Sequence, residues 1–170
     1  HEYICTDGGI YRWDEGNVTV SIDARNFEKA AQSALATGKK EELCHACSLY
    51  YGEFLSQMTG EKWVNVIGVK YQELYFKCLR LASRLLKADR EYDRLLNLSA
   101  AASKLYPYEE CQMMKLDCLI ALKRYQEAME VYKQVVVQYF EEQGLPPSET
   151  MLQRFRLMSG QISYTSDMLK

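Results

Sequence analysis

Two stretches in the second half of the chain repeat each other, and this internal repeat constrains the fold more than any other feature. Residues 78–107 align with residues 111–140 at an offset of 33 residues. The alignment pairs the same or similar residue types at six positions: Cys78 with Cys111, Leu81 with Met114, Leu86 with Leu119, Ala88 with Ala121, Tyr92 with Tyr125 and Tyr106 with Tyr139. Each unit contains two helical patterns joined by a short charged turn, and this period is typical of tetratricopeptide-like helical hairpins.

Apolar periodicity predicts further helices on both sides of the repeat. Three precede or enter it, over residues 24–37, 39–51 and 61–88. Asp23 is expected to cap the first of these and Gly38 to end it, while Ser148 is expected to cap a last helix near the end of the chain. The predicted fold is therefore mainly α: a tetratricopeptide-like α-α superhelix of about seven helices, preceded by a short β-hairpin.

Two of the predicted helices carry apolar faces that we expect to point into the core. In the helix over 24–37 these residues are Phe27, Ala30, Ala31, Ala34 and Leu35. In the helix over 61–88 they are Trp63, Ile67, Tyr71, Leu74, Cys78, Leu81 and Leu85, which are spaced by threes and fours.

The expected hairpin lies in "CTDGGIYRW", residues 5–13. Asp7, Gly8 and Gly9 are turn residues between two apolar segments, which predicts a tight turn between antiparallel strands. A third strand is expected over "NVTVS", residues 17–21. An isolated hairpin has too little surface to be stable as a sheet of its own. A hairpin before a helical protein is therefore unusual, and it can indicate the function.

The six cysteines favour packing over chemistry. Cys78, Cys111 and Cys118 fall at apolar positions of helical patterns, so we expect them to be reduced and buried, as in a cytoplasmic protein. The "CHAC" motif at 44–47 has no second ligand pair with zinc spacing, and it lies within a helical stripe rather than at the start of a helix. We therefore expect core packing there, with His45 in solvent.

Composition argues against catalysis, metal binding and a membrane span. The chain has two histidines, one of them at position 1, which leaves almost no room for a catalytic Ser-His or Cys-His arrangement. There is no complete phosphate-binding glycine motif, and we expect no enzyme activity, no cofactor and no metal. The net charge is −2, no run of Lys and Arg exceeds two residues, and no apolar run is long enough to span a bilayer.

Two longer motifs resemble a known family. "LYYGEFLSQMTGEKWV", residues 49–64, is similar to a signature of the bacterial transcriptional activator domain. Residues 106–151 resemble that domain's Pro-Tyr-x-Glu-Glu opening, its Ala-Leu-x-x-Tyr-x-x-Ala turn and its Glu-x-x-Gly-x-x-Pro-Ser-x-Glu-Thr ending. The resemblance covers about residues 20–158. The chain departs from the family in "SQMTG", and in the "LKRY" turn, where lysine and arginine replace glycine.

The domain is typical of Streptomyces antibiotic regulatory protein-type activators, where it follows a winged helix-turn-helix. "GGIYRW" and "DARNFE" stand where that family has the end of the wing and the start of the helical domain. The resemblance implies that residues 1–22 are the wing hairpin and residues 23–170 the helical domain, with the recognition helix upstream of this chain. Arg12 is the one cation in residues 2–23, and it is the candidate for a contact with nucleic acid.

These observations leave two kinds of function open. The resemblance implies the regulatory and oligomerisation domain of a DNA-binding transcriptional activator. Its DNA contact would be made through the missing recognition helix, and the domain itself would contact a second copy, the DNA-binding domain or RNA polymerase. The alternative is a freestanding tetratricopeptide-like module that binds a peptide or a small ligand on its concave face.

Overall fold

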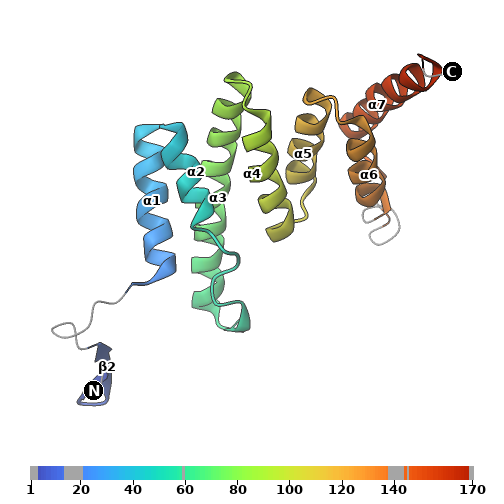
Figure 1. Ribbon diagram of the computed structural model, residues 1–170. Helices are drawn as coiled ribbons and strands as arrows, with labels where there is room; N and C mark the ends of the chain where they lie inside the picture. Colours follow the sequence, from blue (N-terminus) through green and yellow to red (C-terminus); the bar gives the residue numbers. More distant parts are fainter. Residues whose placement is uncertain (1–3, 14–20, 59, 138–143, 145, 169–170) are drawn as a thin grey trace. The chain divides into compact units, whose positions relative to one another are not determined.

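A computed structural model describes residues 4–13, 21–58, 60–137, 144 and 146–168 (Figure 1). Its elements, in chain order, are β1 (Ile4–Asp7), β2 (Ile10–Trp13), α1 (Asp23–Thr37), α2 (Lys40–Ser48), the 3₁₀ turn η1 (Ser56–Met58), α3 (Lys62–Ala88), α4 (Tyr92–Leu105), α5 (Glu109–Ala121), α6 (Tyr125–Val136) and α7 (Glu149–Met168). The prediction of a mainly α protein with about seven helices after a β-hairpin is confirmed for this described part. The chain divides into two compact units, residues 1–78 and 79–170, which are described separately below.

The hairpin has the predicted turn. Strands β1 and β2 pair antiparallel, with Ile4 opposite Trp13 and Asp7 opposite Ile10. Gly8 and Gly9 have φ angles of 57° and 83°, and a two-residue turn with positive φ at both positions suits the twist of the strands. Residues 17–20 of the expected third strand lie outside the described residues, and Ser21 is not in a strand.

In the first unit, helices α1 and α2 pack side by side as a helical hairpin. Gly38 ends α1 as predicted, with a φ of 65° and its N–H donating to the carbonyl of Ala34. The predicted cap is wrong by one residue, because Ile22 occupies the cap position and its carbonyl accepts the N–H of Asn26 at 2.9 Å. Asp23 is the first helical residue, and its Oδ1 accepts the N–H of Ala24 at 2.7 Å.

The core face of α1 is narrower than the sequence pattern predicted. Phe27, Ala31 and Ala34 are buried, whereas Ala30 and Leu35 are only half-buried. The buried residues follow one another at intervals of four and three, so they form a single line along α1, and Ala30 and Leu35 flank it.

The predicted core face of α3 is displaced by about one residue over much of the helix. Tyr71 and Cys78 are buried as expected, but Ile67, Leu74, Leu81 and Leu85 are half-buried. The other buried side chains of α3 are Val64, Tyr75, Phe76, Leu79, Ala82 and Leu86. The helix has apolar residues at neighbouring positions along most of its length, so periodicity finds the apolar arc but does not locate its centre.

Trp63 is the clearest exception to the predicted core of α3. Its side chain is 50% exposed, and it meets Phe54 edge-on with ring centroids 6.3 Å apart. Trp63 lies in the first turn of α3.

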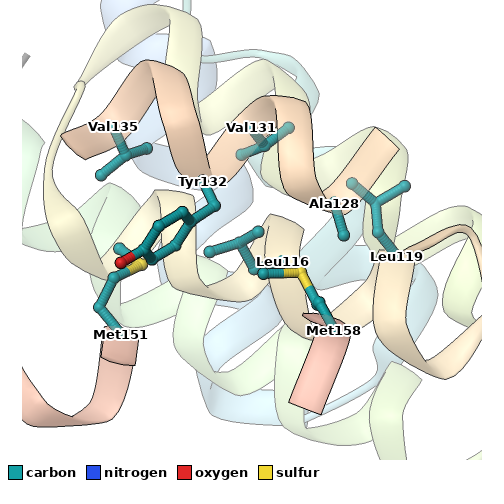
Figure 2. Close-up of a cluster of buried hydrophobic side chains, with 8 residues drawn as sticks. All are labelled: Leu116, Leu119, Ala128, Val131, Tyr132, Val135, Met151 and Met158. Carbon is teal, nitrogen blue, oxygen red and sulfur yellow. The ribbon is translucent and has the colours of Figure 1, made fainter. Parts of the chain in front are cut away.

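The second unit has an apolar core made by α5, α6 and α7. Figure 2 shows its buried side chains meeting between the three helices: Leu116, Leu119, Ala128, Val131, Tyr132, Val135, Met151 and Met158. Tyr132 also stacks on Phe155 of α7, with ring centroids 4.9 Å apart. Helix α4 packs against α5 in the same unit, so four of the seven helices belong wholly to it.

The sequence repeat is reproduced in the backbone of the second unit. Helices α4 and α6 begin at the aligned residues Tyr92 and Tyr125. The residues that precede them in the two turns, Arg90 and Lys123, have left-handed φ angles of 60° and 59°. In each turn the next N–H donates backward to a carbonyl five residues earlier: Glu91 to Leu86 at 2.9 Å and Arg124 to Leu119 at 2.8 Å.

The side chains at these turns form equivalent ion pairs with exchanged charges. Glu91 pairs with Arg94 at 2.6 Å in the first turn, and Arg124 pairs with Glu127 at 2.6 Å in the second. Both pairs join residues three apart across the first turn of a helix, where side chains face each other.

Candidate functional site

The hairpin places Arg12 on an exposed strand. Arg12 lies opposite Cys5 in the β1–β2 register, and its neighbours Ile10 and Tyr11 are 71% and 76% exposed. Arg12 is the one cation in residues 4–13, so this part of the hairpin could neutralise a single phosphate. No described contact tests its role with nucleic acid, and that role stays a prediction.

The first family signature forms an aromatic cluster in the first unit. Tyr50 stacks on Tyr75 of α3 with ring centroids 4.5 Å apart, and Phe27 of α1 lies 4.9 Å from Tyr50. Phe54 meets Tyr71 edge-on at 5.4 Å. Offset and edge-on ring pairs stabilise a core beyond the area that they bury. The signature residues therefore connect the loop that follows α2 with both α1 and α3 within this unit.

A small hollow lies beside this aromatic cluster. It has a volume of about 180 Å³ and is lined by Asp23, Ala24, Phe27, Leu49, Tyr50, Tyr51, Gly52, Glu53, Phe54, Leu55 and Tyr71. Gly52 has a φ of 133°, which explains a glycine at this position of the signature. The hollow is smaller than the usual pocket of a drug-sized ligand.

One polar contact fixes α3 to α1 beside the rings. Glu28 accepts hydrogen bonds from Lys70 Nζ at 2.5 Å and from the Tyr71 hydroxyl at 3.4 Å. The hydrogen bond from Lys70 is the main reason why the pKa of Glu28 lies below its ordinary value. Burial is the main reason why the pKa of Tyr71 is raised. These three groups therefore hold one another across the contact between the two helices.

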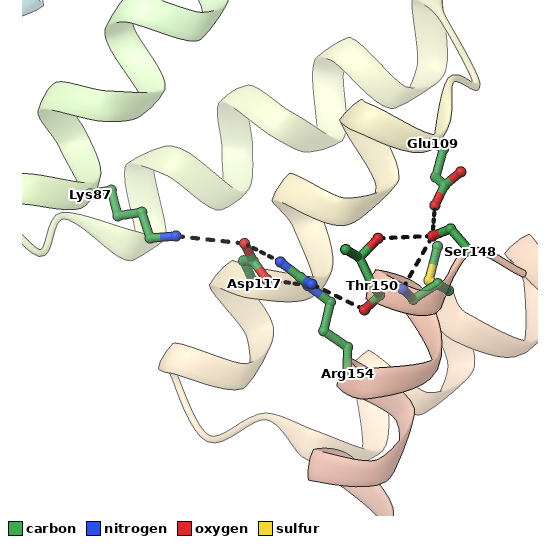
Figure 3. Close-up of polar contacts among 7 residues, drawn as sticks. Lys87, Glu109, Asp117, Ser148, Thr150 and Arg154 are labelled. Carbon is green, nitrogen blue, oxygen red and sulfur yellow. Dashed lines mark hydrogen bonds and ion pairs between the residues drawn. The ribbon is translucent and has the colours of Figure 1, made fainter.

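The second set of family motifs meets in space in the second unit (Figure 3). Glu109, from the "PYEE" opening, accepts a hydrogen bond from the Ser148 hydroxyl, which comes from the "PPSET" ending. Ser148 Oγ also accepts the N–H of Met151 at 3.2 Å, as a helix N-cap does. The predicted cap of the last helix is confirmed. The sequence contains both motifs, but nothing in it indicates that they touch.

A second polar tie lies near the first. Arg154 of α7 holds both carboxylate oxygens of Asp117 on α5, at 2.6 and 3.2 Å. Lys87 of α3 reaches the same carboxylate at 3.6 Å, as Figure 3 shows. The carboxylate of Asp117 therefore links three helices of this unit.

An apolar hollow of about 200 Å³ lies next to the Ser148 cap. Its lining is Glu109, Val135, Val136, Pro146, Pro147, Ser148 and Met151. Only Glu109 and Ser148 are polar, and they hydrogen-bond to each other. This leaves apolar side chains as the main lining that a ligand would contact.

The cysteines of the helical repeat lie in the core, as predicted. Cys78, Cys111 and Cys118 are fully buried, and burial raises the pKa of each thiol to about 11. Cys47 of the "CHAC" motif is 6% exposed, and burial raises the pKa of its thiol as well. Such thiols are poor nucleophiles and poor metal ligands at neutral pH, because both roles need the thiolate.

The surroundings of the "CHAC" motif agree with a packing role. His45 is exposed, as predicted, and Cys44 is half-buried. Among the residues that the structure describes, no three His, Cys, Asp or Glu side chains lie close enough together to hold a metal ion. In that same part of the chain, no helix is both long and apolar enough to cross a bilayer.

Comparison with known proteins assigns the family. The family model described as "Bacterial transcriptional activator domain" matches residues 22–156. Searches of curated proteins and of solved structures give no significant match. The matched region begins at the residue before α1 and ends within α7, and it includes both sets of motifs described above. The family is a regulatory one and not a family of enzymes. The chain belongs to the bacterial transcriptional activator domain family.

Proposed function

We propose that the chain is the regulatory and assembly part of a DNA-binding transcriptional activator of the Streptomyces antibiotic regulatory protein type. Residues 1–22 are the wing hairpin of its winged helix-turn-helix, and residues 23–170 are the helical domain. The observation that carries the proposal is the family match, which begins at residue 22, together with the glycine-turned hairpin at residues 4–13 that precedes it and ends in "GGIYRW".

The proposed role of the helical domain is contact with other proteins. Its described polar groups serve mainly structural purposes: Glu28, Glu109 and Asp117 each hold a partner from another helix. An array of helical hairpins offers broad surfaces for protein contact rather than a closed catalytic pocket. A second copy, the DNA-binding domain and RNA polymerase are the proposed partners.

The hairpin alone is not expected to hold DNA. Neutralising several phosphates requires clustered cations, and Arg12 is the single cation between residues 2 and 23. The 170-residue chain should therefore show no sequence-specific binding to the promoter next to its gene in a gel-shift assay. A chain extended upstream through a helix-turn-helix should bind in the same assay. A nanomolar shift with the 170-residue chain would contradict the proposal.

Self-association can be tested without DNA. Residues 23–170, fused to a heterologous DNA-binding domain that represses only as a dimer, should repress a reporter carrying that domain's operator. The matched control is the same fusion with Tyr75→Ala, because Tyr75 is 1% exposed in the aromatic cluster and its truncation destabilises the domain. Repression equal to that of the DNA-binding domain without a fusion partner would argue against a dimer and leave the polymerase contact as the proposed role.

A further inference from the structure

A groove in the second unit contains a cation, Arg84, that takes part in none of the contacts described above. The groove has a volume of about 430 Å³, and its lining comes from α3, α4 and α5: Arg80, Ser83, Arg84, Lys87, Leu95, Met114 and Asp117. Three of these residues are cations and one is an acid. We call this feature the basic groove.

Two ion pairs join α3 to α5 along this groove. Arg80 holds both oxygens of Glu110, at 2.6 and 2.7 Å, and Lys87 contacts Asp117 at 3.6 Å. The two cations are seven residues apart on α3, and the two acids are seven residues apart on α5. The two pairs therefore lie about two helical turns apart along both helices. This spacing leaves room for one more pair between them, which we call the middle rung.

The middle rung has a cation but no acid. Arg84 lies between Arg80 and Lys87 on the same face of α3, and the α5 residue that lines the groove between the two acids is Met114. Met114 receives a contact from the Ser83 hydroxyl at 3.2 Å instead. Among the described residues, Arg84 has neither a hydrogen bond nor an ion pair, and its side chain is exposed.

The apolar part of the groove lies within reach of this unpaired cation. Leu95 of α4 is 3% exposed and Met114 is half-buried, and both contribute to the lining beside Arg84. A ligand that fits would place one carboxylate on the guanidinium and an apolar side chain against Leu95 and Met114. Methionine suits such a surface, because its flexible side chain adapts to different partners.

We propose that the basic groove binds an acidic amphipathic peptide segment of a partner protein. A carboxylate of the segment pairs with Arg84, and an apolar side chain of the segment covers Leu95 and Met114. This proposal rests on the proposed protein-contact function and names a surface for it. Nucleic acid fits less well, because Arg80 is paired with Glu110 and Lys87 shares Asp117 with Arg154, whereas phosphate chains need several free cations.

The test is a selection from a displayed library of random 16-residue peptides on the 170-residue chain. Selected peptides should be enriched in Asp and Glu next to Leu, Ile or Phe. Fluorescence anisotropy of a labelled selected peptide should show binding that weakens by about tenfold or more with Arg84→Glu. Lys104→Glu is the matched control, because Lys104 is exposed on α4 of the same unit, lies outside the groove lining and undergoes the same change in charge.

A charge exchange makes the test specific. A peptide with Lys in place of its Glu residues should bind Arg84→Glu better than it binds the parent chain. Selection of peptides without acidic residues, equal binding by Arg84→Glu and the parent, or an equal loss with Lys104→Glu would overturn the proposal. Tighter binding of a random DNA duplex than of the peptides, lost with Arg84→Glu, would overturn it in favour of nucleic acid.

The two proposals can fail separately. The reporter fusion should still repress with Arg84→Glu if the basic groove is a site for a partner and not the dimer contact. Peptide binding without reporter repression would support the groove and argue against self-association. Repression without peptide binding would support self-association and argue against the basic groove as a peptide site.

Discussion

Different kinds of contact stabilise the interior of each of the two units, although each unit contains family signature residues. In the first unit the signature residues act through rings: Tyr50 stacks on Tyr75, and Phe54 meets Tyr71. In the second unit the motifs meet through polar groups, with the Ser148 hydroxyl donating to Glu109, beside a core that is mostly aliphatic. The comparison shows that the motifs of one family stabilise the fold in two ways. Ring packing does not depend on the charge of the side chains, whereas hydrogen bonds to carboxylates do.

The largest effect should come from breaking the aromatic cluster. Tyr75→Ala removes a ring that is 1% exposed and stacked on Tyr50, and we expect a loss of about 4 kcal/mol in the free energy of unfolding. Thermal unfolding followed by circular dichroism measures it. Tyr51→Ala is the control, since Tyr51 is 75% exposed, and it should change the unfolding free energy by less than about 0.5 kcal/mol. Equal losses in the two variants would contradict the role given to the cluster.

A smaller effect should follow from removing the polar tie of the second unit. Ser148→Ala removes both the N-cap of α7 and the partner of Glu109, and we expect a loss of about 1 kcal/mol. Urea unfolding measures the change. Ser33→Ala, at an exposed position of α1, is the control and should be neutral or slightly stabilising, because alanine favours a helix. A loss of similar size in both variants would show that the cap contributes nothing.

The repeat itself offers a change in the stabilising direction. Lys123 has a φ of 59° in the turn before α6, a conformation that costs free energy for any residue with a Cβ. Lys123→Gly should therefore raise the free energy of unfolding by about 0.5 kcal/mol, and Arg90→Gly should do the same at the equivalent turn. Differential scanning calorimetry of both variants tests this. A drop in melting temperature would indicate that the lysine and arginine side chains stabilise these turns.

The smallest effect should be a change in acid stability. The hydrogen bonds from Arg80 are the main reason why the pKa of Glu110 lies below its ordinary value. Its contribution is therefore present above the unfolded-state pKa and is lost as the pH falls through the lower folded-state pKa. Glu110→Gln should flatten the loss of stability below about pH 5, by no more than about 0.5 kcal/mol because the pair is exposed. Urea unfolding at pH 4 and pH 7 measures it, and an unchanged difference between the two pH values would contradict it.

Turns and helix ends, which depend on local sequence, could be predicted. The identity of the buried residues could not, because it depends on where the centre of a broad apolar helix face lies. The hairpin turn at Gly8 and Gly9 and the helix stop at Gly38 follow from backbone conformations that glycine favours. Trp63 was predicted to be buried and is half exposed, because a periodic pattern does not show on which sides a helix is covered. The first cap was misplaced by one residue, since Asp23 can bond its neighbour from within the helix.

The polar contacts of the second unit lay beyond the reach of sequence reasoning. Glu109 and Ser148 are 39 positions apart, and a carboxylate on a helix face usually points into solvent. The spacing of Arg80, Arg84 and Lys87 on one face of α3 was visible in the sequence, but their partners were not. Only the packing of α5 against α3 shows that one of the three cations lacks an acid.

The exchanged charges at the two repeat turns bear on how such repeats diverge. Glu91 with Arg94 and Arg124 with Glu127 occupy equivalent positions on nearly identical backbones. A chain that passes from one pair to the other by direct exchange of a cation for an acid at each position holds two like charges at one step. Each pair contributes only a few tenths of a kcal/mol at the surface, so that intermediate remains folded. Paired charges in such repeats can therefore reverse by single steps, while the left-handed residue of the turn keeps the geometry of the next helix.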